Sequence, residues 1–445
     1  MNPALEANNS MLERRVLIFP GGTEIAMEIL ASLRHTRGLK LFSAGEDTSN
    51  HAPFAFDSYH ILPNVKENGW LEAIKALCTK LHIDYIFPAH DDAVVALAKH
   101  SHELPGVMAP PLETCEVCRS KSRTYNIMSD TICVPRTFSS IDEIDSFPVF
   151  VKPDRGQGSK DATTIKSREQ LVYAIKNIDE PLICEYLPGE EFTIDCFSSK
   201  SGLLFAGARR RIRMRNGIAM STERVELVEA VPLAEAIADK IKMRGAWFFQ
   251  VRRRANGDLA LLEVAPRIAG AMALHRAAGI NFPLLTLFDR EEVPVKIMIN
   301  DQPRILDRSL RNRWMHSLSF KNIYVDLDDT LIENGKVNLE LVKFLYSCIN
   351  SKKKIILLTK HANDLSKTLA THRLTGIFDQ IIHIQDGSPK SKFISDRNSI
   401  FIDDSFSERL EVATACGIAT LDSSMLEFLA NQAEKLNADS SAEKN

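Results

Sequence analysis

The feature that most constrains the fold is a repeated unit: a short apolar run, a turn, and then an amphipathic helical pattern. "RVLIFPGG" leads into "TEIAMEILASLR", and "IDYIFPAHDD" leads into "AVVALAKH". A buried strand that passes through a tight turn into a helix is the repeating unit of a parallel sheet. We therefore predict an α/β fold, with a Rossmann-like domain over residues 1–112.

Functional residues in such sheets lie beyond the carboxyl ends of the strands. Gly21 and Gly22 follow the first apolar run, and His90, Asp91 and Asp92 follow the later one. These positions are candidates for ligand contact. The alternative is local: the glycines make a tight turn, and one of the acids starts a helix.

Bulk properties exclude several classes of protein. With 445 residues, the chain is long enough for two or three domains. A net charge of −3 argues against a nucleic-acid partner. The sequence contains no apolar run long enough to span a membrane, and the opening residues lack a secretory pattern. With eight cysteines and no export pattern, we expect reduced thiols and a cytoplasmic location. A homo-oligomer is left open.

A second block, residues 113–300, carries a nucleotide-binding pattern. Lys152 ends an apolar strand and is followed by "RGQGS". A lysine can neutralise phosphate charge there, and glycines let backbone N–H groups approach phosphate oxygens. Further on, "LICEYLPGEEF" places Glu185 where a carboxylate and the neighbouring backbone can grip an adenine edge. Glu190 or Glu191 can then accept hydrogen bonds from ribose hydroxyls.

The same block ends in a predicted hairpin, "GAWFFQVRRRANGDLALLEVAPR". Its two strands place Gln250 and Glu263 side by side, as two ligands that converge on one hard cation. Upstream, "GARRRIRMRNG" offers arginines for an acidic substrate, with Arg211 and Arg213 as weak candidates. A solvated basic loop is the alternative for most of them.

A charged connector over residues 301–318 precedes a third block, residues 319–431. "YVDLDDTLI" delivers Asp326 and Asp328 beyond the end of an apolar strand. One carboxylate can attack phosphorus while the other protonates the leaving group and later activates water. "KIILLTKH" ends a second strand in Thr359, a predicted phosphate contact.

The remaining acids and bases of this block complete a phosphate-removing pattern. "SPKSKF" supplies a charge-balancing lysine, for which we prefer Lys390 and place Lys392 second. "SIFIDDSF" ends a strand in Asp403 and Asp404, which are suited to anchor Mg²⁺ together with the two earlier aspartates. The stretch between Thr330 and Thr359 leaves little room for a cap domain, so we expect an open site. Residues 432–445 are predicted to form a flexible tail.

Residues 15–289 resemble the ATP-grasp superfamily, in the branch like the large subunit of carbamoyl phosphate synthetase. The resemblance rests on "VLIFPGGTEIAMEILASLR", "KSRTYNIM", "VFVKPDRGQGS", "CEYLPGEEFTIDC" and "EVAPRIAGAMALHRAAGINFP". It implies a Rossmann-like pre-ATP-grasp domain followed by an α+β ATP-grasp domain. The implied roles are phosphate lysines (Lys121, Lys152), a lid (Gly156, Gly158, Ser159), adenine linker (Glu185, Tyr186, Leu187), ribose acid (Glu191), magnesium ligands (Gln250, Glu263) and an acyl-phosphate arginine (Arg267).

The resemblance further implies ATP with Mg²⁺, or Mn²⁺ as an alternative ion, and small carboxylate and amine substrates. In this family the last motif is usually Glu-x-Asn-Pro-Arg, but here Ala265 occupies the asparagine position. Water or a nucleotide oxygen can fill the vacated position, because Mg²⁺ tolerates water ligands. We expect a working site with a looser second metal.

Residues 319–431 resemble the haloacid dehalogenase superfamily, whose phosphatase members share the pattern Asp-x-Asp-x-Thr. This resemblance implies a Rossmannoid α/β domain with Asp326 as nucleophile, Asp328 as acid/base and Lys390 as the third-motif lysine. The sequence as a whole predicts a bifunctional enzyme, an ATP-dependent carboxylate–amine ligase joined to a Mg²⁺-dependent phosphatase. The alternative is a phosphatase whose ATP-grasp part binds nucleotide for regulation or recruits substrate.

Overall fold

The computed structural model describes residues 13–429, except 157, 159, 301–302 and 315. Its contacts divide the chain into two compact units, Met1–Leu310 and Arg311–Asn445. The predicted tail, residues 432–445, lies outside the described residues, and so does Ser159 of the predicted lid. The finer domain boundaries remain predictions.

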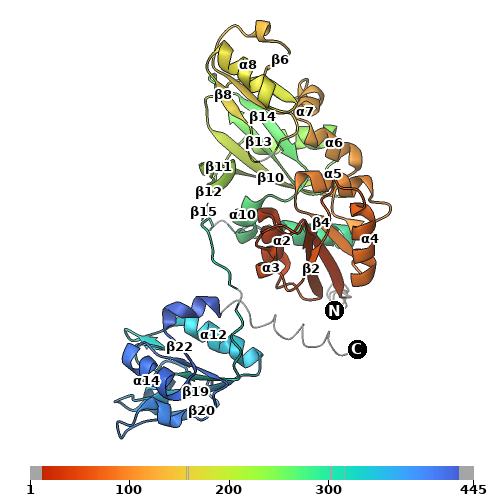
Figure 1. Ribbon diagram of the computed structural model, residues 1–445. Helices are drawn as coiled ribbons and strands as arrows, with labels where there is room; N and C mark the ends of the chain where they lie inside the picture. Colours follow the sequence, from red (N-terminus) through yellow and green to blue (C-terminus); the bar gives the residue numbers. More distant parts are fainter. Residues whose placement is uncertain (1–12, 157, 159, 301–302, 315, 430–445) are drawn as a thin grey trace. The chain divides into compact units, whose positions relative to one another are not determined.

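The first unit opens with a parallel five-stranded sheet, as the repeated strand–turn–helix pattern predicted. Its order is β3-β2-β1-β4-β5. Strands β2 and β3 are added on one side of β1, and β4 and β5 on the other, so the strand order switches between β1 and β4. The loops after these two strands carry the predicted Gly21 and His90. Helices flank the sheet (Figure 1). The elements are β1 (Arg14–Phe19), α2 (Glu24–Leu33), β2 (Leu39–Gly45), α3 (Ala52–Ala55), β3 (Tyr59–Ile61), α4 (Trp70–Leu81), β4 (Tyr85–Pro88), α5 (Asp91–Lys99) and β5 (Gly106–Val107).

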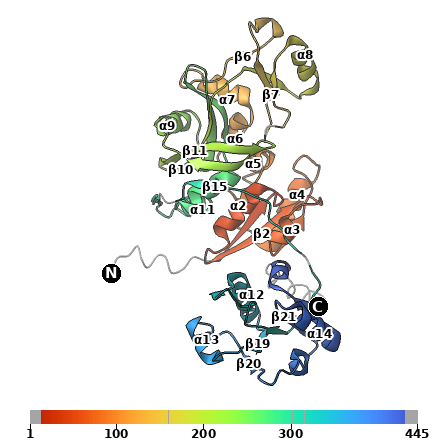
Figure 2. The ribbon, with the colours of Figure 1, turned by 90° about the vertical axis from the view of Figure 1, so that its left-hand side faces the viewer.

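Two antiparallel sheets follow in the same unit. The smaller has the order β6-β9-β7-β8, and the larger has the order β14-β13-β10-β11-β12-β15. Helix α9 lies beside β10 and β11 (Figure 2). The elements are α6 (Leu112–Arg119), α7 (Lys121–Met128), β6 (Thr137–Phe138), β7 (Val149–Pro153), β8 (Thr163–Ile165), α8 (Arg168–Asn177), β9 (Pro181–Glu185), β10 (Glu191–Ser199), β11 (Gly202–Arg215), β12 (Ile218–Arg224), α9 (Ala230–Lys240), β13 (Gly245–Arg253), β14 (Leu259–Ala265), α10 (Ala273–Ala277), α11 (Phe282–Arg290) and β15 (Ile305–Asp307).

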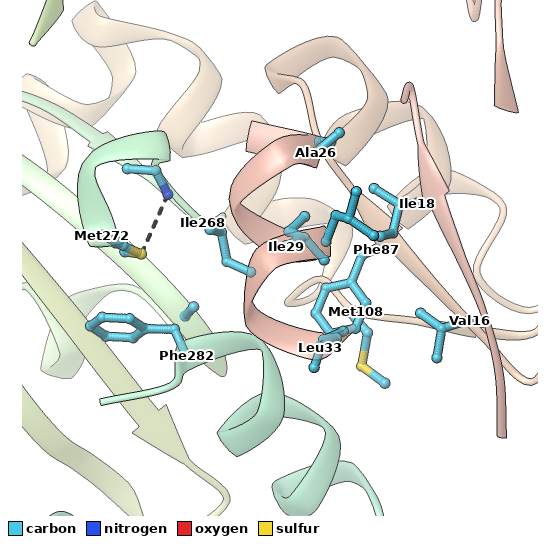
Figure 3. Close-up of a cluster of buried hydrophobic side chains, with 14 of the residues drawn as sticks. Val16, Ile18, Ala26, Ile29, Leu33, Phe87, Met108, Ile268, Met272 and Phe282 are labelled. Carbon is cyan, nitrogen blue, oxygen red and sulfur yellow. Dashed lines mark hydrogen bonds between the residues drawn. The ribbon is translucent and has the colours of Figure 1, made fainter. Parts of the chain in front are cut away.

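One apolar core joins the N-terminal sheet to the larger antiparallel sheet. Helix α2 presents Ile29 and Leu33 between Phe87 on one side and Met272 and Phe282 on the other (Figure 3). All five side chains are at most 2% exposed. Burial of this size holds the two parts as one packed body, so residues from both can be brought to a common site.

Strand β15 was not predicted. It lies inside the range taken for a connector and pairs with β12, with Ser221 opposite Asp307. The stretch around it is charged and lacks apolar periodicity, which concealed a three-residue edge strand. The chain therefore leaves the first unit only after closing the edge of its largest sheet.

The second unit is a parallel five-stranded sheet with the order β20-β19-β16-β21-β22. In the described chain, only a small hairpin (β17–β18) and α12 lie between Thr330 and β19, so no cap domain is inserted there. The elements are β16 (Asn322–Val325), β17 (Ile332–Glu333), β18 (Lys336–Val337), α12 (Leu339–Asn350), β19 (Lys354–Thr359), α13 (Leu365–Thr371), β20 (Gln380–His383), β21 (Ser399–Ile402), α14 (Phe406–Cys416) and β22 (Ala419–Leu421).

Candidate functional site

A pocket of about 470 Å³ in the first unit gathers residues that are far apart in the sequence. Its walls come from both antiparallel sheets and from the loops after β1 and β4. Of the two acids predicted for ribose, Glu191 lines the pocket and Glu190 does not. The other described residues predicted to bind nucleotide, the predicted metal ligands and the arginine of this block line it as well: Lys121, Lys152, Gly156, Gly158, Glu185, Tyr186, Leu187, Gln250, Glu263 and Arg267.

The two predicted phosphate lysines are buried at the pocket wall, each 8% exposed. Lys152 Nζ donates to Tyr125 Oη at 2.8 Å and to the Leu262 carbonyl at 3.3 Å. Lys121 Nζ donates to the Asp154 and Gly156 carbonyls, both at 3.2 Å. In the described part of the chain, neither ammonium group forms an ion pair. Burial lowers the pKa of Lys152. Two buried cations held only by neutral oxygens favour an anionic ligand.

The predicted adenine linker connects β9 to β10, but its acid is used differently from the prediction. Glu185 Oε1 accepts from Arg254 Nε at 3.0 Å and from the Arg136 backbone N–H at 2.8 Å. This carboxylate therefore fastens the linker to neighbouring loops. Tyr186 and the buried Leu187 line the pocket beside it. A long-range ion pair of this kind leaves no trace in local sequence.

Arg211 lies at the centre of the pocket's polar wall. Its Nη1 contacts Glu191 Oε1 and lies 3.1 Å from Gln250 Oε1, and its Nη2 donates to the Gly217 carbonyl at 2.6 Å. Its Nε is buried without a partner in the described chain. The other weak candidate, Arg213, is 58% exposed and pairs with Asp307. Only Arg211 of the two lines the pocket.

The β13–β14 hairpin sets the predicted metal ligands opposite each other. Gln250 and Glu263 are direct partners in the register, and Ala265 is paired with Phe248. Carboxylate and amide oxygens on adjacent strands suit Mg²⁺. Ala265 is 6% exposed and borders a smaller cavity of about 40 Å³, which Glu263 and Arg267 also line. The position of the missing asparagine is thus beside the candidate metal ligands.

Arg267 is fixed by the N-terminal domain. Its Nε and Nη2 donate to the two oxygens of Asp91 at 2.5 and 2.8 Å, and the side chains are 11% and 13% exposed. Burial acts to raise the pKa of Asp91, but the Arg267 charge and hydrogen bonds outweigh it and hold that pKa below its usual value. The predicted acid after β4 therefore orients the predicted arginine after β14. Gly21, Gly22 and Asp92 do not line the pocket, whereas His90 does.

Three further arginines, Arg209, Arg252 and Arg308, line the pocket without having been singled out as site residues. Arg209 is held bidentately by Asp195 at 2.8 and 3.1 Å, and His275 Nδ1 lies 2.8 Å from the same carboxylate. Arg308, which follows β15, pairs with Glu24 at 2.8 Å. The run "GARRR" signals Arg209, but nothing in the sequence marks Asp195 or His275 as its partners.

The second unit holds a separate charged cluster at the carboxyl ends of its central strands. Lys390 Nζ lies 2.7 Å from Asp326 Oδ1 and 2.6 Å from Asp403 Oδ2, and all three side chains are at most 9% exposed. Burial raises the pKa of Asp326 to about 6, although Lys390 opposes the shift. The preferred lysine is therefore the one in the cluster, because Lys392 is exposed.

Three of the four predicted acidic ligands come together. Asp326, Asp403 and Asp404 each offer an oxygen, and these oxygens lie within 4.8 Å of one another. Thr330 Oγ1 donates to Asp404 Oδ1 at 2.9 Å and so orients it. Oxygen donors at this spacing fit a hard divalent cation such as Mg²⁺.

Asp328 departs from its predicted place in the metal set. Its two oxygens lie 2.9 and 3.0 Å from His361 Nδ1. Asp328 lies beyond the end of β16, which closes at Val325, so the alternation of side chains along the strand does not fix the direction of its carboxylate. Thr359 is fully buried, and its Oγ1 accepts from the His361 backbone N–H at 3.2 Å. The sequence reasoning missed His361, although "LLTKH" ends the strand that carries Thr359.

Family models match two parts of the chain. A model described as "PylC-like, N-terminal domain" matches residues 16–109, and one described as "ATP-grasp in the biosynthetic pathway with Ter operon" matches residues 177–307. Neither match extends into the second unit. No helix among the described residues is long and apolar enough to cross a membrane.

Curated relatives are D-alanine–D-alanine ligases. The enzyme of Fusobacterium nucleatum is 28% identical over 19% of this chain and 30% of its own length. Ligase A of Clostridium perfringens is 29% identical over 32% of this chain and 52% of its own length. The matched part of the chain thus covers 30% and 52% of the lengths of these two relatives.

Solved structures share the fold. L-amino acid ligase from Bacillus licheniformis superposes with a TM-score of 0.53 at 19% identity, over 64% of this chain and 76% of that one. N5-carboxyaminoimidazole synthetase from Staphylococcus aureus, solved with ADP, gives 0.54 at 15% identity, over 65% and 80%. The chain therefore has an α/β ATP-grasp fold, as predicted, and its N-terminal domain is PylC-like. The finer likeness to carbamoyl phosphate synthetase remains a prediction.

Proposed function

We propose that this chain, whose first unit is of the ATP-grasp ligase family, is an ATP-dependent carboxylate–amine ligase joined to a Mg²⁺-dependent phosphatase of the haloacid dehalogenase type. One observation carries the ligase: two buried lysines, which form no ion pair with any residue that the structure describes, face the same pocket as Gln250, Glu263 and Arg267. Phosphoryl transfer needs charge neutralisation and positioning more than covalent assistance. The pocket supplies both.

The residues present fit ATP and Mg²⁺. Lys121 and Lys152 would take phosphate oxygens, and Gln250 and Glu263 would hold Mg²⁺, which neutralises phosphate charge when bound. Glu191, now contacted by Arg211, would accept from the ribose. The sequence similarity to D-alanine–D-alanine ligases supports the ligase assignment. The shared fold with a synthetase that was solved with ADP supports a nucleotide in this pocket.

The ligase reaction proceeds in two balanced steps. An oxygen of the acid substrate attacks the γ-phosphorus of ATP; an O–P bond forms, the bond to the bridging oxygen breaks, and ADP leaves. The nitrogen of the amine then attacks the acyl carbon, inorganic phosphate departs with the bonding electrons, and the amine proton is lost to solvent. Arg267, held by Asp91, balances the charge on the transferred phosphoryl group.

The phosphatase rests on the Asp326–Lys390–Asp403 cluster. An Asp326 oxygen attacks the phosphorus of a phosphate ester while Asp328 gives its proton to the departing alcohol oxygen. Water then attacks the aspartyl phosphate, Asp328 takes the water proton, and phosphate and free Asp326 are released. Asp326, Asp403 and Asp404 would hold the Mg²⁺. The exposed Asp328 suits a large ester, and so does the absence of an inserted cap between Thr330 and β19 among the described residues.

A screen of acids and amines for stimulated ADP release tests the ligase. We expect Glu263→Gln to abolish the acid-dependent release, whereas Glu235→Gln, an exposed change on α9, should leave it intact. An unaffected rate in the Glu263 variant would refute the ligase assignment. Hydrolysis of a model ester tests the phosphatase.

For the phosphatase, Asp326→Asn should remove ester hydrolysis and keep acid-dependent ADP release. The matched control is Asp364→Asn, because asparagine serves as well as aspartate at the N-cap of α13. Loss of both activities in the Asp326 variant would overturn the two-site model. Whether the phosphatase trims a phosphorylated substrate or product of the ligase is a hypothesis motivated only by the fusion.

A second candidate is favoured by one observation, the replacement of the usual asparagine by Ala265. In that case the ATP-grasp part binds nucleotide for regulation or recruits substrate for the phosphatase. It predicts ATP binding, measured by calorimetry, without acid-dependent ADP release from any acid. The retained Lys121, Lys152, Gln250, Glu263 and Arg267 favour the ligase over this candidate.

A further inference from the structure

We infer that His361 is a positioning residue for Asp328 in the phosphatase site; the inference rests on the phosphatase assignment above. A carboxylate accepts hydrogen bonds, so His361 Nδ1 donates to it, and both Asp328 oxygens lie within reach at 2.9 and 3.0 Å. Nothing in the sequence motifs assigns a function to this histidine.

His361 is itself held from several directions. Its Nε2 lies 2.9 Å from Thr368 Oγ1 on α13, its backbone N–H donates to Thr359 Oγ1 at 3.2 Å, and its carbonyl lies 2.7 Å from His383 Nε2. These residues follow or lie on β19, α13 and β20, next to the strand that delivers Asp328. A ring fixed on both nitrogens and through its backbone has one orientation available.

The exposures of the two side chains show which one is being oriented. The His361 side chain is 6% exposed, whereas that of Asp328 is 51% exposed. A half-exposed aspartate alone would sample several rotamers in water. The buried histidine restricts it to one, with the exposed part of the carboxylate left to face an incoming ester. Preorganisation of this kind lowers the barrier for a proton transfer.

The consequence is confined to the step that needs the proton. While the Asp326 oxygen bonds to phosphorus, the ester P–O bond breaks and the Asp328 proton passes to the leaving oxygen, which becomes an alcohol. A poor leaving group, such as an alkyl alcohol, requires that proton. A good one, such as p-nitrophenolate, departs as an anion without it. His361 variants should therefore discriminate between the two kinds of ester.

Two substitutions separate the hydrogen bonds of the ring. In His361→Asn the amide nitrogen lies near the place of Nδ1 and can still donate to Asp328. In His361→Gln it lies near the place of Nε2, so the Thr368 contact is kept and the Asp328 contact is lost. The full-length variants are assayed with Mg²⁺ on p-nitrophenyl phosphate and on an alkyl phosphate. The parameter is kcat/KM, because it reports the steps up to departure of the alcohol.

We expect His361→Gln to lower kcat/KM about 30-fold or more on the alkyl ester, within the range of general-acid effects, and less than about 3-fold on p-nitrophenyl phosphate. His361→Asn should restore most of the alkyl-ester rate. His372→Asn, on the same unit and outside the site, should change neither.

The outcomes separate this inference from the phosphatase assignment. Equal losses on both esters in the Gln variant, or no rescue by the Asn variant, would show a merely structural histidine and overturn the inference. A wild-type chain that hydrolyses neither ester, or an Asp326→Asn variant that still does, would instead overturn the phosphatase assignment. Circular dichroism of both variants shows whether a loss comes from misfolding, in which case the two esters fall together.

Discussion

The bridge between Asp91 and Arg267 makes the sharpest quantitative test of how the first unit is built. Asp91→Asn removes one charge of a bidentate pair whose side chains are 13% and 11% exposed, and places an amide next to the guanidinium. Removing one partner of a buried pair costs about 3–5 kcal/mol. Because this pair retains some exposure, we expect about 3 kcal/mol, the lower end of that range. At about 2 °C per kcal/mol for a large domain, the melting temperature should fall by about 6 °C.

Calorimetry of the full-length protein measures this shift. The relevant unfolding transition is the one whose melting temperature rises when ATP is added. Asp47→Asn, an exposed change in the same sheet domain, is the control. The folded pKa of Asp91 is depressed, so its stabilisation is present above the unfolded pKa of 3.8 and is lost as pH falls through the folded value. The deficit of the variant should therefore be full at neutral pH and shrink in strong acid. A shift equal to that of the control, or a deficit independent of pH, would refute the reasoning.

Three further changes test other parts of the molecule. Lys390→Met leaves the two buried carboxylates that it bridges without a counter-charge, so ester hydrolysis should fall at least about 100-fold and the second unit should melt earlier; wild-type kcat would contradict this. Ala265→Asn should lower the Mg²⁺ concentration that half-saturates ADP release, because it returns an oxygen beside Glu263; an unchanged requirement would show that the position does not influence the metal. Gly21→Ala should destabilise the first unit by about 1–3 kcal/mol, since the new Cβ would lie 1.8 Å from Ser43 Oγ, and a urea midpoint equal to the wild type would contradict that packing.

Much of the candidate site could be predicted from local sequence patterns. Hydrophobic period and turn chemistry mark each strand end, so Lys152, Asp326, Thr359 and Asp403 were located before any contact was known. The hairpin also placed Gln250 beside Glu263, because a short turn leaves few registers for its strands.

Tertiary structure decided which charges meet. Asp91 and Arg267 are 176 residues apart and pair only because α2 packs between two sheets. Glu185 meets Arg254 where the linker after β9 lies against the turn after β13. The order of the parallel strands brings Asp328 to His361. Sequence alone determined most of the elements, with β15 as an exception, and the chemical groups at their ends, since these follow from interactions between near neighbours. The pairing of those groups follows from how the elements pack, and long-range packing has no local signature.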